Sequence, residues 1–118
     1  MPELYRIIPP LIYDSYAAYS YIPPFDPHEY LTQITTEKEA EILERIAQCE
    51  SKWVMKWNYL HNVRPDYYTA FGYFQIIKTH ELKYGIDRTD PKGNIDLAVL
   101  LYRKNGTSDW LASASCWR

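Results

Sequence analysis

The clearest pattern of apolar and polar positions along the chain is a helical one that begins at Thr36. Thr36 and Glu39, three residues further on, are the side-chain pair of a capping box, which marks the start of a helix. Apolar residues then recur at intervals of three and four along one side, and charged residues occupy the other side. One further turn along the apolar side reaches Cys49 and Glu50. A carboxylate therefore stands where the helical period requires an apolar residue, near the predicted end of the helix.

Shorter helices are predicted in the second half of the chain. Thr79 is placed to cap a helix that closes at Gly85. Asn94 follows a predicted turn and is placed to cap another helix, which ends at Gly106, and Ser108 is placed to cap a last short helix. No series of alternating strands is present. The expected fold is therefore mainly α, with at most a minor β-hairpin near the middle.

The first thirty residues differ in composition from the rest of the chain. They hold six of the eight prolines and six of the twelve tyrosines, whereas all four glycines lie beyond residue 71. Proline fixes φ and removes a backbone donor, so residues 1–34 are predicted to be largely irregular, with at most a short helix around 13–19. The tyrosine rings suit either packing over the following domain or stacking on sugars. We therefore divide the chain into this Tyr/Pro-rich segment and one domain at residues 35–118.

Composition and charge exclude several classes of protein. The 118 residues are 47% hydrophobic and 24% charged, which is too apolar for a disordered chain and sufficient for one folded core. A net charge of −2 argues against a duplex-binding protein with a large basic surface, so nucleic acid is not an expected partner. Residues 1–50 hold nine acids and three bases, a net of −6, and residues 51–118 hold six acids and ten bases, a net of +4. This asymmetry suits either attraction to an anionic polymer or an ordinary solvated surface.

Neither a membrane span nor a secretory signal is visible in the chain. No apolar run approaches the roughly 18 residues that a span requires, and the N-terminus lacks a basic start followed by a continuous apolar stretch. The two cysteines are too few for a disulfide scaffold and lack metal-ligand spacing with the three histidines. We therefore expect a soluble monomer with no metal site and no cofactor.

Glu50 is the candidate for acid chemistry. A carboxyl group at the C-terminal end of a helix faces the negative pole of the helix dipole, and the nearby Trp53 and Trp57 withdraw water from it. Both effects raise the pKa of the carboxyl group, as a general acid for glycosidic cleavage requires. The alternative is that Glu50 is a hydrated residue at a frayed helix end.

Several short motifs follow one another in a fixed order over residues 36–118. They are Cys49-Glu50-Ser51, the segment Ala70 to Ile76 with Gly72 and Gln75, Pro91 with Asn94-Ile95 and Ala98, Leu101-Tyr102 with Gly106, and Trp110, Ser113 and Cys116-Trp117. In this order and spacing they resemble the lysozyme-like soluble lytic transglycosylase (SLT) domain. The resemblance implies an α+β lysozyme-like fold with a substrate groove, in a compact variant with Cys-Glu-Ser and a later Cys-Trp.

The resemblance implies roles for individual residues. Glu50 matches the sole catalytic acid, and Ser51 matches a hydroxyl group that positions the substrate or the helix end. Gln75 matches a glutamine that lines the groove, although it also suits the cap of a turn. Gly72 lies in an aromatic run, where it indicates a tight backbone passage and would allow the backbone to approach the glycan.

Thr69 and Tyr102 match further substrate-binding positions. Thr69 stands where relatives often have a serine. Tyr102 corresponds to the tyrosine that touches the catalytic carboxyl group, although its helix face would be buried in any case and the family's later Tyr-Asn pair is absent. In a compact variant of this kind Cys49 and Cys116 are expected to pair in a disulfide, and two buried free thiols are the alternative.

The resemblance implies a one-acid mechanism on peptidoglycan glycan strands. Glu50 would protonate the oxygen between N-acetylmuramic acid and N-acetylglucosamine, and then act as base so that the 6-hydroxyl group closes a 1,6-anhydro sugar. A two-carboxylate hydrolase would need Asp66, Asp87 or Asp90 as the second acid, and the last two suit turns better.

Two other functions stay open at this point. One is a lysozyme-type hydrolase on the same fold, and the other is a non-catalytic peptidoglycan-binding module. All three functions place the protein outside the cytoplasm, in the periplasm, cell wall or secreted, or on a phage particle.

Overall fold

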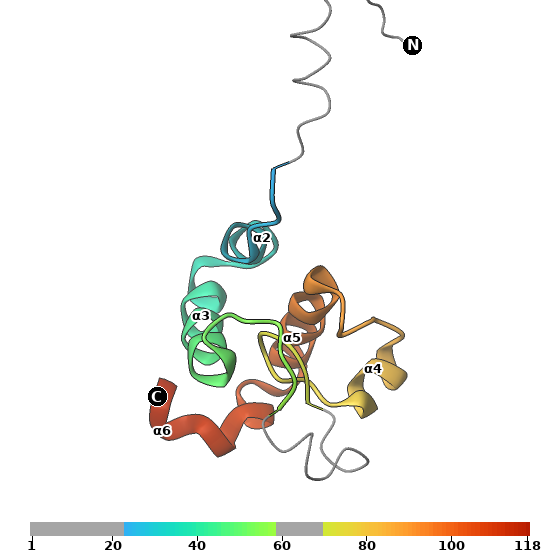
Figure 1. The fold of residues 1–118 in the computed structure, drawn as a ribbon. Helices are drawn as coiled ribbons and strands as arrows, with labels where there is room; N and C mark the ends of the chain where they lie inside the picture. Colours follow the sequence, from blue (N-terminus) through green and yellow to red (C-terminus); the bar gives the residue numbers. More distant parts are fainter. Residues whose placement is uncertain (1–22, 59–69) are drawn as a thin grey trace, which may run out of the picture.

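The part of the chain that the structure describes is mainly helical, as the sequence predicts. The computed structural model describes residues 23–58 and 70–118, so the helix considered around 13–19 lies outside it. Its helices, in order, are α2 (Pro27–Ile34), α3 (Glu37–Ser51), α4 (Lys78–Tyr84), α5 (Pro91–Asn105), the 3₁₀ helix η1 (Ser108–Ser113) and α6 (Ala114–Trp117). Figure 1 shows α3 and α5 at the centre, with α2 above them and α6 below. In the described residues, strand pairing consists of two isolated bridges, Trp57 with Phe71 and Phe71 with Ile76.

Helix α3 has the predicted capping box and apolar side. The Thr36 hydroxyl group accepts from the Glu39 N–H at 3.2 Å, and the Glu39 carboxylate accepts from the Thr36 N–H at 2.9 Å. The apolar side of the helix is buried in the core. The helix therefore starts where the sequence predicts and ends at Ser51, one residue beyond Glu50.

Glu39 also connects the start of α3 to the end of α5. Its two carboxylate oxygens accept from Nε and Nη2 of Arg103, both at 2.9 Å. The hydrogen bonds from Arg103, and then that from the Thr36 backbone, lower the pKa of Glu39 to about 2. Because the unfolded value is about 4.3, the folded state favours the ionised carboxylate, and this contribution to stability is complete above about pH 5 and is lost as the pH falls toward 2.

The pH dependence of this contact gives a first prediction. Glu39→Gln should flatten the fall of the melting temperature between about pH 5 and pH 2, because its side chain no longer titrates. Glu37→Gln is the matched control, since Glu37 is an exposed acid in the same first turn. Thermal unfolding followed by circular dichroism at several pH values measures the effect. Equal acid dependence in wild type and Glu39→Gln would contradict the prediction.

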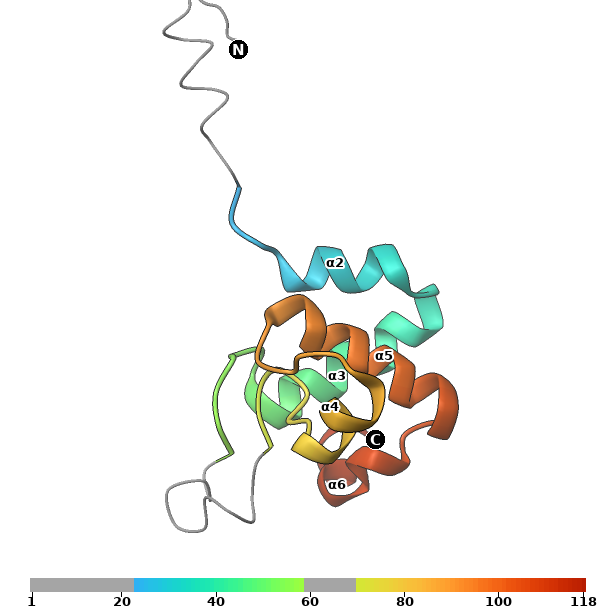
Figure 2. The same ribbon diagram turned by 90° about the vertical axis from the view of Figure 1, so that its right-hand side faces the viewer.

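Part of the segment expected to be irregular is helical. Asp26 caps α2 by accepting from two backbone N–H groups, and a proline at the first position favours the helix start. Leu31 is fully buried, and the Tyr30 hydroxyl group donates to Asp96 on α5 at 2.6 Å. Figure 2 shows α2 lying across α3 and α5, and it contacts both. The packed part of the chain therefore includes α2, which the sequence places in the Tyr/Pro-rich segment.

Three predicted helix caps are wrong, although the glycine ends of α4 and α5 are as predicted. The cap of α5 is Asp90, whose carboxylate accepts from the Gly93 N–H at 2.9 Å, so Asn94 lies inside the helix. An aspartate followed by proline is a complete start signal, and it precedes Asn94. Helix α4 begins before Thr79 and has no side-chain cap, and Ser108 is the first residue of η1 rather than its cap.

Asn94 instead holds the middle of the chain to α5. Its side chain is fully buried. Its Oδ1 accepts from the Phe74 N–H at 3.0 Å, and its Nδ2 donates to the carbonyl groups of Phe71 at 2.9 Å and Arg88 at 2.8 Å. These bonds satisfy backbone groups of two separate loops, so Asn94 fixes the turn at 70–76 against α5.

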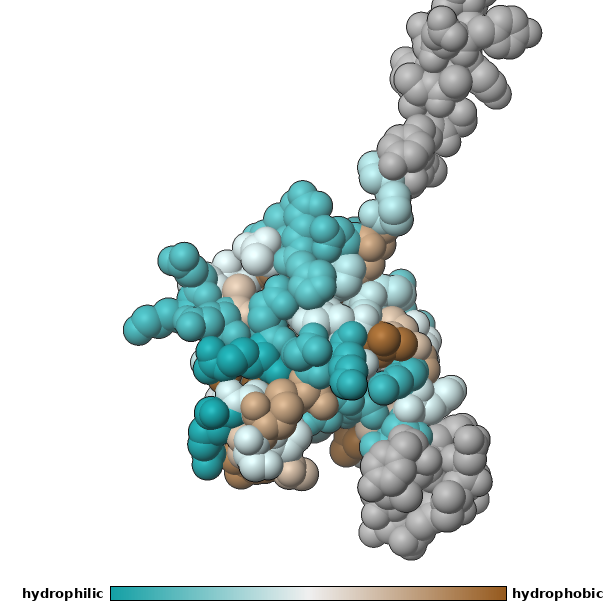
Figure 3. All heavy atoms as spheres, turned by 60° about the vertical axis from the view of Figure 1, so that its left-hand side comes forward, coloured by the Kyte–Doolittle hydropathy of each residue, from teal (hydrophilic) through white to brown (hydrophobic). Residues whose placement is uncertain are grey.

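The surface of the described residues is mostly polar. Figure 3 shows a face on which apolar side chains form small separate patches among hydrophilic ones. The large apolar side chains that are exposed are Phe25, Val54, Trp57, Ile77, Leu82 and Leu111. Within residues 23–58 and 70–118, none of the helices has the length and apolar character needed to cross a membrane.

Candidate active site

Glu50 lies in the last turn of α3 and is partly exposed. Burial raises the pKa of the Glu50 carboxyl group above its ordinary value, and a hydrogen bond from Ser113 opposes part of that rise. The direction agrees with the prediction from the sequence. The main cause is loss of water around the carboxyl group, so Glu50 retains its proton to higher pH than an exposed glutamate.

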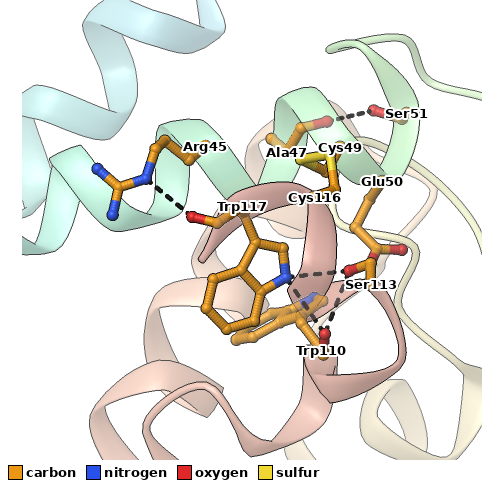
Figure 4. Close-up of a disulfide and its surroundings, with 9 residues drawn as sticks. All are labelled: Arg45, Ala47, Cys49, Glu50, Ser51, Trp110, Ser113, Cys116 and Trp117. Carbon is orange, nitrogen blue, oxygen red and sulfur yellow. Dashed lines mark hydrogen bonds between the residues drawn. A yellow bond between two sulfur atoms is a disulfide. The ribbon is translucent and has the colours of Figure 1, made fainter.

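The hydroxyl group of Ser113 is the hydrogen-bonding partner of Glu50 within the described residues. Ser113 is the last residue of η1, and its Oγ donates to Oε2 of Glu50. The buried indole of Trp117 in turn donates from Nε1 to Ser113 Oγ at 3.0 Å. Figure 4 shows the indole nitrogen, the hydroxyl group and the carboxyl group in sequence. The C-terminal helices therefore bring a polar partner to the candidate acid.

A disulfide fixes this arrangement covalently. Cys49 and Cys116 are bonded, with their Cα atoms 5.9 Å apart, which confirms the expected pairing. Cys49 directly precedes Glu50, and Arg45 one turn earlier donates from Nε to the Trp117 carbonyl group at 3.1 Å. Helix α6 is thus held to α3 by a covalent bond and a hydrogen bond (Figure 4).

The Ser51 side chain is buried and makes its hydrogen bonds within the protein. It is 1% exposed. Its hydroxyl group donates to the Tyr73 carbonyl group at 2.9 Å and accepts from the Val54 N–H at 3.2 Å. Of the two roles that the resemblance implies, these contacts support positioning of the helix end, because the buried hydroxyl group is not accessible to a substrate.

Backbone strain is concentrated just after α3 and in the turn that faces it. Lys52 and Trp53 have left-handed φ values of 56° and 58°, and Gln75 has 49°. Such conformations cost about 1–3 kcal/mol each in non-glycine residues and persist only where the surroundings impose them. The Trp53 ring is held by Tyr73 and Phe74, whose ring centres lie 5.2 and 5.5 Å away. The end of the helix that carries Glu50 is therefore fixed by packing.

Gln75 joins the two loops beside α3. Its Nε2 donates to the carbonyl groups of Lys56 and Gly72, both at 2.9 Å. These bonds support the alternative in which Gln75 stabilises a turn. Its Oε1 has no hydrogen bond within the described residues, and contact of Gln75 with a substrate stays a prediction.

Gly72 is buried, and its lack of a side chain makes room for Asn94. Its φ is +91°, and an added Cβ would lie 2.2 Å from Asn94 Nδ2. The tight backbone passage predicted for Gly72 is confirmed. The space beside Gly72 is filled by the protein's own Asn94, so these contacts give the glycine a role in packing rather than in approach to a glycan.

Gly72→Ala should lower the free energy of unfolding by about 2–3 kcal/mol, because it combines an unfavourable φ with displacement of a fully hydrogen-bonded side chain. Gly85→Ala is the matched control, since its φ is +68° and nothing lies within 4 Å of the added Cβ. That change should cost about 1 kcal/mol. Urea unfolding of both variants measures the difference, and equal losses would show that Asn94 moves aside without cost.

Tyr102 is not hydrogen-bonded to Glu50 among the described residues. It lies on α5 and packs against the core. Ser113 instead occupies the place beside the carboxyl group, because η1 and α6 fold back against α3. Thr69 lies outside the described residues.

In the sequence, Ser113 is recognised only as part of a motif, with no role assigned to it at the site. One signal was present: if Cys49 pairs with Cys116, the residues next to each cysteine must also lie close together. Ser113 is three residues before Cys116, one helical turn away, while Glu50 directly follows Cys49. The missed partner therefore follows from the disulfide and the helical period.

The other carboxylates considered are engaged elsewhere or lie outside the described residues. Asp87 accepts from the N–H and hydroxyl groups of Thr89 at 2.9 and 2.6 Å, and these bonds lower its pKa. Asp90 caps α5, and Asp66 is outside the described residues. Across residues 23–58 and 70–118, no carboxylate shares a hydrogen bond with Glu50, and no group of three or more His, Cys, Asp and Glu side chains is arranged to hold a metal ion.

Two cavities of the described structure are not lined by Glu50. One of about 510 Å³ lies beside α5 and is lined by Ile34, Ile86, Asp96, Val99, Leu100, Arg103 and Lys104. One of about 120 Å³ is lined by Gln75, Ile76, Ile77, His80, Leu101, Asp109 and Trp110. A substrate groove at Glu50 stays a prediction.

No protein-family model, no curated protein and no solved structure matches the chain. Conclusions about function therefore depend on the chemistry of the site and on the motifs in the sequence.

Proposed function

We propose that the chain is a peptidoglycan-cleaving glycosidase of the lytic transglycosylase type, with Glu50 as its single catalytic acid and base. The observation that carries this proposal is the placement of Glu50: a partly buried carboxyl group at the end of α3, held at one oxygen by Ser113. The resemblance to the SLT domain supplies the substrate class, the β-1,4 bond between N-acetylmuramic acid and N-acetylglucosamine.

The first step uses Glu50 as an acid. Burial raises the pKa of Glu50, so it holds its proton to higher pH than an exposed glutamate does, as a general acid requires. Oε1 has no hydrogen bond within the described residues, so it is the oxygen that gives the proton to the glycosidic oxygen. The bond from C1 to that oxygen then breaks, and the acetamido group of the muramic sugar stabilises the positive charge left at C1.

The second step uses the same group as a base. The Glu50 carboxylate takes the proton of the sugar's 6-hydroxyl group while that oxygen bonds to C1 and closes the 1,6-anhydro ring. Glu50 thus ends the cycle protonated again, because the proton of the 6-hydroxyl group replaces the one that stayed on the leaving sugar, and no water is consumed. A hydrolase with two carboxylates needs a second acid near the first, and Asp87 and Asp90 are both occupied in turns and caps.

The disulfide supports a location outside the cytoplasm or on a phage particle. Disulfides persist in oxidising surroundings and are rare in the reducing cytosol. Peptidoglycan is also outside the cytoplasm, so the bond between Cys49 and Cys116 is consistent with the proposed substrate. The protein acts as a monomer in this proposal, since one chain supplies the acid and its partner.

Digestion of purified peptidoglycan tests the proposal. The products should end in 1,6-anhydro sugars, each lighter by one water molecule than the product of hydrolysis, and mass spectrometry separates the two. Peptidoglycan incubated without the protein is the blank. Products with free reducing ends would indicate a lysozyme-type hydrolase, and co-sedimentation with peptidoglycan without released products would indicate a binding module.

A further inference from the structure

Ser113 lies where it can decide which oxygen of Glu50 holds the catalytic proton. We propose that Ser113 is a positioning residue that reserves Oε2 of Glu50 as a hydrogen-bond acceptor and so directs the acid's proton to Oε1. The inference rests on the proposed function of Glu50 and adds to it a division of labour between the two carboxyl oxygens.

The single proton of the Ser113 hydroxyl group has two possible acceptors. A serine hydroxyl group has one proton to donate and two lone pairs that accept. The Trp117 indole donates to Ser113 Oγ at 3.0 Å and occupies one lone pair. Two acceptors are then within reach of the Ser113 proton, Oε2 of Glu50 and the Trp110 carbonyl oxygen, which lies 3.1 Å from Oγ.

The carboxyl group is the stronger of these two acceptors. Hydrogen bonds to ionised groups are shorter and about twice as strong as those between neutral groups. The Trp110 carbonyl group also receives the Trp117 indole N–H at 3.3 Å, so it already has a donor. The Ser113 proton therefore points at Oε2 of the Glu50 carboxylate, and a proton that this carboxylate takes up goes to Oε1. Figure 4 shows one carboxyl oxygen of Glu50 pointing away from Ser113.

Ser113 is held firmly enough to act in this way. The Trp110 indole donates to the Phe74 carbonyl group at 2.9 Å and anchors η1 in the core. On the other side, Cys116 is bonded to Cys49, the residue before Glu50. A group that orients a catalytic side chain must itself be fixed by packing and hydrogen bonds, and Ser113 meets this condition from both directions.

Charged groups around Glu50 do not provide an alternative control. The elements that contact α3 are α2, η1 and α6, and the charged or titratable side chains on or beside α3 and these elements include His28, Arg45, Lys52, Asp109 and Arg118. His28 on α2 is hydrogen-bonded to Glu44, at 2.9 Å. Arg45 donates to the Trp117 carbonyl group, and the Arg118 guanidinium group lies over the Trp117 ring. Oδ1 of Asp109 lies 3.5 Å from Nε2 of His80. Lys52 is exposed, and none of them contributes to the raised pKa of Glu50.

The test compares Ser113→Ala with Ser113→Thr, which keeps the hydroxyl group, and with Ser115→Ala, which removes an exposed hydroxyl group two residues away. We expect Ser113→Ala to lower the turnover of peptidoglycan roughly tenfold or more, the range for a lost hydrogen bond to a charged group. The alkaline limb of its rate–pH profile should move to higher pH, because the carboxylate has lost a donor. Ser113→Thr should restore both properties, and Ser115→Ala should leave both unchanged.

A second measurement does not depend on catalysis. NMR titration of ¹³C-labelled glutamate carboxyl groups reports the protonation of Glu50 directly, and its midpoint should rise in Ser113→Ala but not in Ser115→Ala. A folded Ser113→Ala protein with wild-type turnover, pH profile and titration would overturn the inference, as would a Thr variant no better than the Ala variant. A raised midpoint in a protein that cleaves no glycan would support the hydrogen-bond assignment and overturn the proposed function instead.

Discussion

Glu50→Gln should bind glycan and fold normally but barely cleave it. The amide has the same size as the carboxyl group and its carbonyl oxygen can still accept from Ser113, so the end of α3 keeps its contacts. The amide has no acidic proton to give to the glycosidic oxygen. General acid catalysis contributes about 10²- to 10⁴-fold, and the loss should be at least that large because Glu50 acts in both steps. Initial rates of muropeptide release measure the effect.

Glu41→Gln is the matched control, since it makes the same change at an exposed position of the same helix. It should retain wild-type activity. Melting temperature and co-sedimentation with peptidoglycan show whether Glu50→Gln remains folded and able to bind. Without a general acid, the residual activity of Glu50→Gln should lie far below about a tenth of wild-type turnover. If Glu50→Gln keeps more than that, Glu50 is not the catalytic group, and the binding module becomes the better proposal.

Loss of the disulfide should lower the free energy of unfolding by about 4 kcal/mol. Its two cysteines are 67 residues apart, and in the chain-entropy model a loop of that size restricts the unfolded chain by about this amount. The double variant Cys49→Ser/Cys116→Ser should therefore unfold at a clearly lower denaturant concentration than the oxidised protein. Guanidinium unfolding followed by tryptophan fluorescence measures the difference.

The chain provides its own control for this prediction. It has two cysteines, so reducing the wild-type protein breaks one bond and changes no other residue. Reduced wild type and the double variant should unfold at the same denaturant concentration. Equal midpoints for oxidised and reduced protein would mean that the bond adds nothing to stability.

Local signals in the sequence were sufficient to predict the helix that carries the candidate acid. The capping box at Thr36 and the regular apolar side place α3 correctly because both depend on residues within one or two turns of each other. Helix α2 was missed since its proline-rich surroundings predict irregular chain, although Asp26 and a following proline form a start signal. The role of Asn94 was missed because it depends on backbone groups of two separate loops, one of which is 20 residues away in the sequence.

The residues of the candidate site likewise differ in how far the sequence predicts them. Glu50 is visible in the sequence because a carboxylate interrupts an apolar side, which is a local contradiction. Ser113 has no local signal, because its contact with Glu50 joins residues 63 apart and forms only when η1 and α6 pack on α3. Only the expected pairing of Cys49 with Cys116 points to it. Tyr102 was assigned by resemblance alone, and in the described structure it is partly buried against the core.

The disulfide also makes the backbone between Cys49 and Cys116 a closed covalent ring. A protease that cuts one peptide bond anywhere inside this ring leaves both fragments in one molecule, whereas a cut outside it releases a piece. Nicked protein would therefore run as a single full-mass species on a non-reducing gel and separate into two bands only after reduction. Activity that survives such a nick would be lost when the thiols are regenerated, so proteolytic damage to this protein stays hidden while its surroundings are oxidising.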